Sequence, residues 1–258
     1  MRDFLDVLAD DAKKTVKEGF YDDVEAAPAV KLSLEGSILS CRRAAIISEV
    51  KPASPSMGAL HGGRSPATLA REMEEGGAIG ISVLTEPKHF QGSMLTLAEV
   101  RRAVKVPILM KDIVLSQVQV DAAARAGANA VLLIYSVFER GHSEVKLEDM
   151  IEYAHGRGVE VLLEVHTRKE FQSSLNYEAD MIGVNNRDLR TLKVDLNVTR
   201  KVLAGYIGSR VVVSESGISG PEDVRFLYAC GAKAFLVGTS IMKAASVKDK
   251  VRELVEAL

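Results

Sequence analysis

The sequence contains no tryptophan and only two cysteines and seven prolines among its 258 residues. Cys41 and Cys230 lie far apart and have no His or Cys neighbours at metal-ligand spacing, so we expect two reduced thiols packed in the core and no metal site. No apolar run reaches the length of about 18 residues that a membrane span needs. The N-terminus is amphipathic and lacks the apolar core and cleavage site of a signal peptide.

Neither sign of charge is in clear excess: the chain has 33 basic and 35 acidic residues, and its formal net charge is -2. Such a balance gives no indication of a nucleic-acid or membrane partner. We therefore expect a soluble protein of the cytoplasm. At 47% hydrophobic residues the chain can bury a sizeable core, and its length allows one large domain or two small ones.

What the sequence does contain is a regular alternation from residue 44 onward. Short runs rich in β-branched residues are nearly continuously apolar, as in parallel strands that are covered on both faces. Eight such runs occur, at 44–51, 77–85, 106–112, 128–135, 159–166, 179–187, 210–217 and 232–240.

Longer amphipathic segments separate the runs, and several end in Gly before the next run, which is a helix C-terminal signal. Eight β-α units at this spacing predict a (β/α)8 TIM barrel of the α/β class; a doubly wound open sheet is the alternative. No linker rich in Pro, Gly or Ser divides the chain. We expect a single barrel domain over 1–258, with 1–43 as an N-terminal helical extension packed on it.

Polar residues gather at one end of these strands. In a barrel of this kind the C-terminal ends of the strands form the active face, and charges next to apolar strands are costly unless they are paired or solvated. Six of the eight runs end this way, which favours one shared polar pocket. The residues are Glu49 and Lys51, Lys111 and Asp112, Glu164 and His166, Asn185 to Arg187, Glu215 to Gly217, and Gly238 to Ser240.

The last two strand ends have the composition of a phosphate site. SESGIS follows the seventh run and VGTSIM the eighth, and both offer hydroxyls and Gly backbone amides. Barrels often hold phosphate after strands 7 and 8, at backbone N–H groups.

The remaining chemistry consists of three carboxylates and two lysines: Glu49, Glu164, Glu215, Lys51 and Lys111. No Ser-His-Asp set, Gly-rich dinucleotide loop or Walker loop is present. His166 is close to the pocket, but a histidine there is more often a strand-end residue with a local hydrogen bond. The sequence thus indicates acid/base chemistry on a phosphorylated metabolite, with neither an organic cofactor nor a metal.

Seven stretches in this order resemble the indole-3-glycerol phosphate synthase family of tryptophan biosynthesis. They are SEVKPASPSMG, SVLTEPKHFQGS, VPILMKDIVLS, LLEVHTRKE, IGVNNRDLRTL, VSESGIS and FLVGTSIM, spread over 48–242. The resemblance implies a carboxy-lyase that closes the indole ring of 1-(2-carboxyphenylamino)-1-deoxyribulose 5-phosphate by general acid/base catalysis. The products are indole-3-glycerol phosphate, carbon dioxide and water.

The resemblance also implies roles for individual residues. Lys111 is the acid that protonates the C2′ carbonyl, and its apolar neighbours are expected to lower its pKa. Glu164 is a general acid/base, Glu49 positions or exchanges protons with the lysines, and Lys51 binds substrate anions. The catalytic set is completed by Asn185 and Glu215. The substrate-binding set is Ser54, Ser56, Phe90, Arg187, Leu189, Ser216, Gly217, Gly238, Thr239 and Ser240.

Three positions depart from the family pattern, namely Met57, His89 and Ile113, and none is a catalytic position. Two rival interpretations remain. One is another cofactor-free barrel such as phosphoribosylanthranilate isomerase, which is expected to carry a Cys at a strand end. The other is a barrel that binds a phosphorylated ligand without turning it over. We expect a monomer or a weak homo-oligomer, and the sequence leaves room for separate partner enzymes of the tryptophan pathway.

Overall fold

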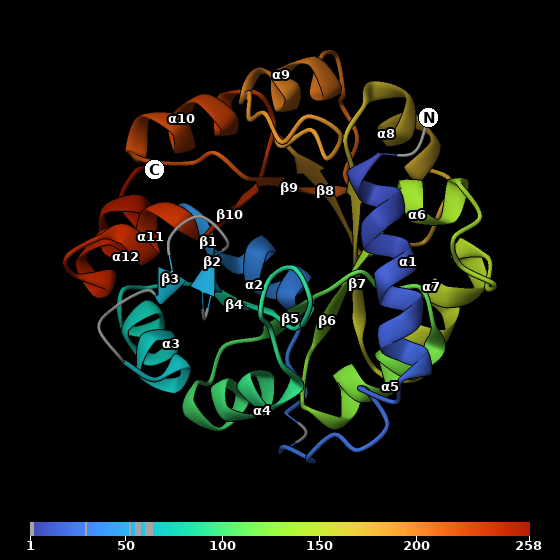
Figure 1. Ribbon diagram of the computed structural model, residues 1–258. Coiled ribbons are helices and arrows are strands. Elements are labelled where there is room, and N and C mark those ends of the chain that lie inside the picture. The colour runs from blue at the N-terminus through green and yellow to red at the C-terminus, as the bar shows by residue number, and fades with distance from the viewer. Residues whose placement is uncertain (1–2, 29, 52, 55–57, 60–63) are drawn as a thin grey trace.

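The computed structural model describes residues 3–28, 30–51, 53–54, 58–59 and 64–258. Eight parallel strands form a closed barrel in the order β1-β10-β9-β8-β7-β6-β5-β4, and Figure 1 looks along its axis. The barrel strands are β1 (Ala45–Val50), β4 (Gly80–Leu84), β5 (Ile108–Lys111), β6 (Ala130–Ile134), β7 (Glu160–Val165), β8 (Met181–Asn185), β9 (Val211–Glu215) and β10 (Ala234–Val237). The predicted (β/α)8 barrel is confirmed, and each of the eight apolar runs contains one of its strands.

Helices surround the barrel and connect its strands (Figure 1). They are α3 (Pro66–Glu75), α4 (Met94–Ala103), α5 (Gln117–Arg125), α6 (Tyr135–Glu139), α7 (Leu147–Gly156), α8 (Arg168–Ser174), α9 (Asn197–Leu203), α10 (Pro221–Ala229), α11 (Thr239–Lys243) and α12 (Val247–Val255). Local chemistry fixes several starts: Ser65 and Ser93 accept N–H bonds from Thr68 and Thr96 as N-caps. Within the described residues, no helix is both long and apolar enough to cross a membrane.

Side chains alternate between two cores along each strand, since successive residues of a strand point to opposite faces. In β1, Ile46 and Val50 face the layer between strands and outer helices, whereas Ala45 and Ile47 face the barrel interior. Glu49 continues the interior series. Along the inward face of a strand, the apolar residues therefore lie toward the N-terminal end of the barrel. The polar residues of the same face lie at its C-terminal end.

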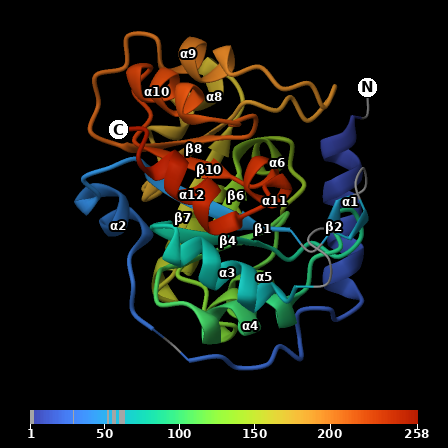
Figure 2. The ribbon, with the colours of Figure 1, turned by 90° about the vertical axis from the view of Figure 1, so that its left-hand side faces the viewer.

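Two helices precede the barrel and lie at its opposite ends, as Figure 2 shows. α2 (Leu34–Ser40) is at the N-terminal end, where the Leu34 and Glu35 amides donate to Glu160 at the start of β7. α1 (Phe4–Lys17) crosses the other end, with Leu5 and Leu8 packed among the interior residues. α1 therefore covers the same end of the barrel as the polar strand ends.

The loop after β1 contains a short antiparallel pair, β2 (Ala53–Ser54) and β3 (Gly58–Ala59), outside the barrel sheet. Cys41 and Cys230 are free thiols, as predicted. The expectation that they are buried in the core is wrong, because both are partly exposed. Each follows the last residue of a helix, α2 and α10 respectively, at the surface.

Candidate active site

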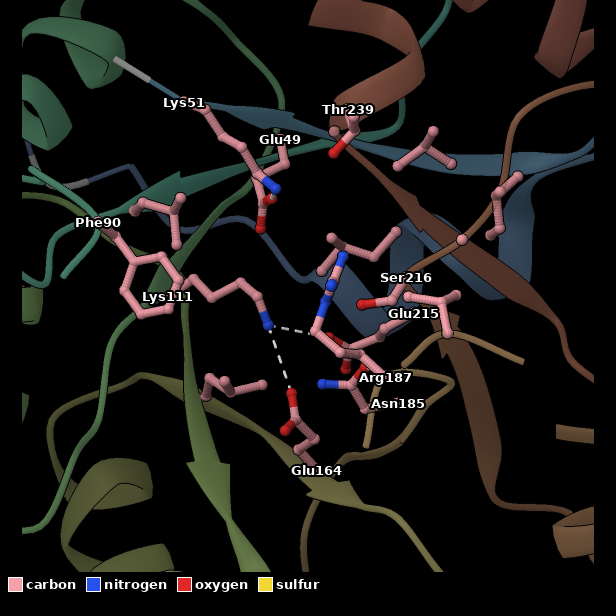
Figure 3. Close-up of a pocket in the computed structure, with 18 of the residues that line it drawn as sticks. Glu49, Lys51, Phe90, Lys111, Glu164, Asn185, Arg187, Glu215, Ser216 and Thr239 are labelled. Carbon is pink, nitrogen blue, oxygen red and sulfur yellow. Dashed lines mark hydrogen bonds and ion pairs between the residues drawn. The ribbon is translucent and has the colours of Figure 1, made fainter. Parts of the chain in front are cut away.

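A cavity of about 510 Å³ opens at the C-terminal end of the barrel. It brings together predicted residues from six strand ends and two loops, and Figure 3 shows ten of them pointing into one space. Those that line it are Glu49, Lys51, Phe90, Lys111, Glu164, Asn185, Arg187, Leu189, Glu215, Ser216, Gly217, Gly238, Thr239 and Ser240. Ser56 and Met57 lie outside the described residues, as does the side chain of Ser54.

The ammonium of Lys111 lies between two buried carboxylates. Its Nζ is 3.0 Å from Glu215 Oε2 and 3.4 Å from Glu164 Oε2 (Figure 3). The Lys111 side chain is 17% exposed, whereas those of Glu164 and Glu215 are 2% and 1% exposed. One cation thus compensates two carboxylates that come from β7 and β9.

This geometry overturns the expected direction of the Lys111 pKa. Burial lowers the pKa of Lys111, but the nearby charges of Glu215, Glu164 and Glu49 outweigh it, and the net pKa is raised. The apolar neighbours in the sequence were a poor guide, because the carboxylates lie 53 and 104 residues further along the chain. At neutral pH Lys111 is therefore protonated.

The two carboxylates differ in acidity. Burial acts to raise the pKa of Glu164, but Lys111, His166 and a hydrogen bond from Asn185 outweigh it and lower that pKa. Burial raises the pKa of Glu215 to about 7, with Lys111 opposing the shift and Glu164 adding to it. Paired carboxyls whose pKa values are pushed apart can divide the roles of base and acid.

A second ion pair comes from β1. Lys51 Nζ lies 3.0 Å from Glu49 Oε1, with side-chain exposures of 24% and 4%, and the Ser82 hydroxyl donates to Glu49 Oε2. Lys51 thus reaches the cavity mouth while Glu49 stays deeper, near enough to Lys111 to raise its pKa.

Two glycines make room for these acids. A Cβ built on Gly183 in β8 would overlap Glu215 Oε1, and one on Gly238 would lie 2.8 Å from Glu49 Oε1. Gly183 was missed in the sequence. It could have been found, because alternate residues of a strand share a face, and Gly183 stands between Met181 and Asn185 on the face that points into the barrel. A Gly inside a strand often marks close approach of another group.

The ends of β9 and β10 form the part of the cavity expected to hold phosphate. After Glu215 the backbone turns through positive φ angles of 68° at Ser216 and 87° at Gly217. Thr239 begins α11, and the first amides of a helix have no partner within it. The Ser240 hydroxyl donates to the Ile218 carbonyl, so Ser240 would offer its amide. Lys243, which sequence reasoning missed, lines the cavity beside them.

The opposite wall is apolar, formed by Phe90, Leu189 and Ile113 together with residues that sequence reasoning missed: Leu8, Leu84, Leu132 and Ile134. Glu86 shapes this wall, since its buried carboxylate accepts the amides of Lys88, His89 and Phe90. Ile113 lines the cavity as part of this wall and is 6% exposed.

His89 has a contact that explains its presence. Its Nε2 lies 3.0 Å from Asp11 Oδ2 on α1, and its ring meets Phe4 edge-on. Asp6, which also belongs to α1, has its Oδ1 3.0 Å from both His142 Nε2 and Arg140 Nη1. These pairs hold α1 over the cavity, where Leu8 forms part of the wall.

Asp112 anchors the end of β5 from the outer side. It is 3% exposed and accepts hydrogen bonds from the Tyr21 and Thr85 hydroxyls and from the Ile113 amide. Burial raises the pKa of Asp112 to about 6 despite these bonds. Tyr21 belongs to the segment between α1 and α2, so the N-terminal extension also fixes the strand that carries Lys111.

Comparison with known proteins decides the family. A sequence profile of the indole-3-glycerol phosphate synthase family matches residues 7–254. The chain belongs to the indole-3-glycerol phosphate synthase family. It is 46% identical to the indole-3-glycerol phosphate synthase of Halobacterium salinarum over 83% of this chain and 82% of that one. It is 37% identical to that of Methanocaldococcus jannaschii over 99% and 90%.

A solved structure adds to the comparison of folds. The thiamine phosphate pyrophosphorylase of Pyrococcus furiosus superposes with a TM-score of 0.61 at 19% identity, covering 87% of this chain and 97% of the other. At that identity the likeness shows the shared barrel only. Of the described residues, no group of three or more His, Cys, Asp or Glu could hold a metal ion.

Proposed function

We infer that the chain catalyses the reaction of its family, the closure of 1-(2-carboxyphenylamino)-1-deoxyribulose 5-phosphate to indole-3-glycerol phosphate, carbon dioxide and water. The observation that carries this proposal is the buried Glu164–Lys111–Glu215 cluster at the floor of a cavity with one apolar and one amide-rich wall. Membership of a carboxy-lyase family of tryptophan biosynthesis supports it.

The cavity suits the three parts of this substrate. The phosphate would lie at Ser216, Gly217, Gly238 and Thr239, where backbone amides and hydroxyls favour an anion. The aromatic ring would pack on the wall of Phe90 and Leu189. Arg187 would hold its carboxylate, for which the guanidinium fork is suited, with Lys51 as a further cation.

The first chemical step joins the ring carbon that bears the carboxylate to C2′. Lys111 would donate a proton to the C2′ oxygen as the bond forms, since an alkoxide is a stronger base than an amine. The raised pKa keeps the lysine charged before this step. Loss of carbon dioxide then returns its bonding electrons to the ring and restores aromaticity.

The second step removes the C2′ hydroxyl as water and a proton from C1′, which leaves the indole double bond. Glu164, whose pKa is lowered, would take the C1′ proton. A protonated neighbour must supply the proton that leaves with the hydroxyl, and both Lys111 and Glu215 lie beside the same site. Glu49 and Asn185 would position these groups.

Turnover of the substrate, followed by indole fluorescence without added metal or cofactor, tests this function. Wild-type protein should convert it, and Glu164→Gln should reduce kcat by about 100-fold or more with KM little changed. Binding of the substrate without conversion would contradict the proposal and favour a non-catalytic barrel. Conversion of phosphoribosylanthranilate instead would favour the isomerase.

A further inference from the structure

His166 lies just behind Glu164 and beside a second, separate cavity. This cavity measures about 200 Å³ and shares Asn185 and Leu189 with the wall of the main one. Its lining includes Arg140, His166, Thr167, Glu170 and Arg190. A volume of this size holds several water molecules at about 30 Å³ each.

The reaction needs a proton from the solvent, and the main cavity alone is a poor route for it. At neutral pH the substrate carboxylate leaves as carbon dioxide, two protons join the C2′ oxygen to form water, and one proton leaves C1′. Each turnover therefore takes up one proton net from the solvent. The substrate fills the cavity during the reaction, and Glu164 is only 2% exposed.

We propose that His166 relays this proton from water in the second cavity to Glu164, and through it to Lys111. The inference rests on the function proposed above. His166 Nε2 lies 3.3 Å from Glu164 Oε1, and the other oxygen, Oε2, lies 3.4 Å from Lys111 Nζ. These two distances place Glu164 between His166, at the second cavity, and the principal acid.

His166 stands two residues after Glu164 and directly follows the last residue of β7. It lines the second cavity, whereas Glu164 lines the main one. Its buried Nε2 makes no hydrogen bond to any described residue, although Glu164 is within reach. A ring nitrogen without a fixed partner can turn toward the carboxylate to deliver a proton and turn back.

The surroundings of His166 suit transfer rather than permanent pairing. Glu170 Oε2 accepts the His166 backbone amide at 2.7 Å and lies 3.8 Å from Nδ1, which places a carboxylate on the solvent side of the ring. The cations of the second cavity already have partners, since Arg140 pairs with Asp3 and Asp6 and Arg190 pairs with Asp188. The charge of His166 also contributes to the lowered pKa of Glu164.

The test measures kcat in dilute buffer for wild type, His166→Ala and His166→Gln, with His155→Ala as the matched control. His155 pairs with Asp180 at the surface and lines neither cavity. Both His166 variants should lose about tenfold or more in kcat with KM little changed. Added imidazole should restore His166→Ala in proportion to its concentration, while leaving wild type and His155→Ala unchanged.

The outcomes separate a relay from a structural role. Full activity of His166→Gln, or a folded His166→Ala variant that imidazole does not rescue, would overturn the relay. So would a His166→Ala kcat within roughly twofold of wild type in dilute buffer. A wild-type protein without turnover would overturn the function itself, and circular dichroism of each variant shows whether it is folded.

Discussion

Lys111 and Glu215 form a buried ion pair of 3.0 Å across the barrel, between β5 and β9. Because Glu164 shares the same ammonium at 3.4 Å, removal of Lys111 takes the shared ammonium away from two buried carboxylates at once. The cluster therefore links catalysis to stability, and its variants should report on both.

Lys111→Met should abolish nearly all turnover and should destabilise the fold. Removal of one partner from a buried pair costs about 3–5 kcal/mol. The loss should be smaller at pH 5 than at pH 8, because the pKa of Glu215 is about 7 and its carboxyl is protonated at pH 5. Urea unfolding at pH 5 and pH 8, together with the turnover assay, measures both effects. Lys248→Met is the control, since Lys248 pairs with Glu75 at side-chain exposures of 40% and 58% and such exposed pairs contribute under about 1 kcal/mol. Retained turnover in Lys111→Met would contradict the assignment of Lys111 as the general acid.

Glu215→Gln should change the pH dependence of stability. The folded pKa of Glu215 is about 7, above the ordinary value of about 4.3, so the folded state binds the proton more tightly. Stability then falls as the pH rises from about 4.3 to about 7. The variant should match wild type below about pH 4 and exceed its unfolding free energy at pH 8, by up to roughly 3.7 kcal/mol. Equal differences at both pH values would contradict the raised pKa.

Gly183→Ala should damage activity more than so small a change suggests. The added Cβ would overlap Glu215 Oε1, so Glu215 must move from Lys111, and kcat should fall by about tenfold or more. Gly156→Ala in α7 is the matched control, since a Cβ there meets nothing within 4 Å. That control should keep full activity, and its unfolding free energy should change by less than about 1 kcal/mol because Gly156 is the last residue of α7. An active Gly183→Ala variant would mean that Glu215 need not hold this position.

Arg187→Ala should act mainly on substrate binding. If Arg187 holds the substrate carboxylate, loss of its fork should raise KM by about 10-fold or more while kcat changes less. Steady-state kinetics checks this, with the exposed Arg200 of α9 changed to Ala as the control. A fall confined to kcat would assign Arg187 to the chemistry instead.

Asp6→Asn should loosen α1 from the barrel. The pKa of Asp6 is lowered, mostly by the hydrogen bond from the Asp3 amide and also by His142 and Arg140. The Asp6 carboxylate therefore stabilises the folded state above a pH of about 4, and this stabilisation is lost as the pH falls below that value. The variant should speed amide exchange in α1 and raise KM, because Leu8 lines the cavity. Asp249→Asn in α12 is the control, and unchanged exchange in α1 would contradict the role of Asp6 in holding the helix.

The fold was predictable because its signal is local. Nearly continuous apolar runs mark strands buried on both faces, and Gly marks the ends of several helices, so each barrel strand was found within a few residues. Strand-end placement also brought Glu49, Lys111, Glu164 and Glu215 to one cavity. The alternation of inward and outward residues along each strand would also have identified Gly183 as an inward-facing position.

Contacts between distant segments were not predictable in the same way. The apolar neighbours of Lys111 suggested a lowered pKa, whereas carboxylates from β7 and β9 raise it. α1 shows an amphipathic pattern, but nothing in that pattern says which end of the barrel it covers. His89 became intelligible only when Asp11 was found beside it.

The closure of the barrel orders events during synthesis. β1 pairs with β4 on one side and with β10 on the other. One edge of the first barrel strand therefore stays unpaired until the last strand has been synthesised. Glu49 leaves the ribosome early, yet its neighbour Gly238 comes from the end of the chain. A nascent chain that stops before β10 has an open sheet edge and no complete cavity, and such an edge invites pairing with other chains. Any early docking of substrate is thereby excluded until nearly the whole polypeptide has emerged.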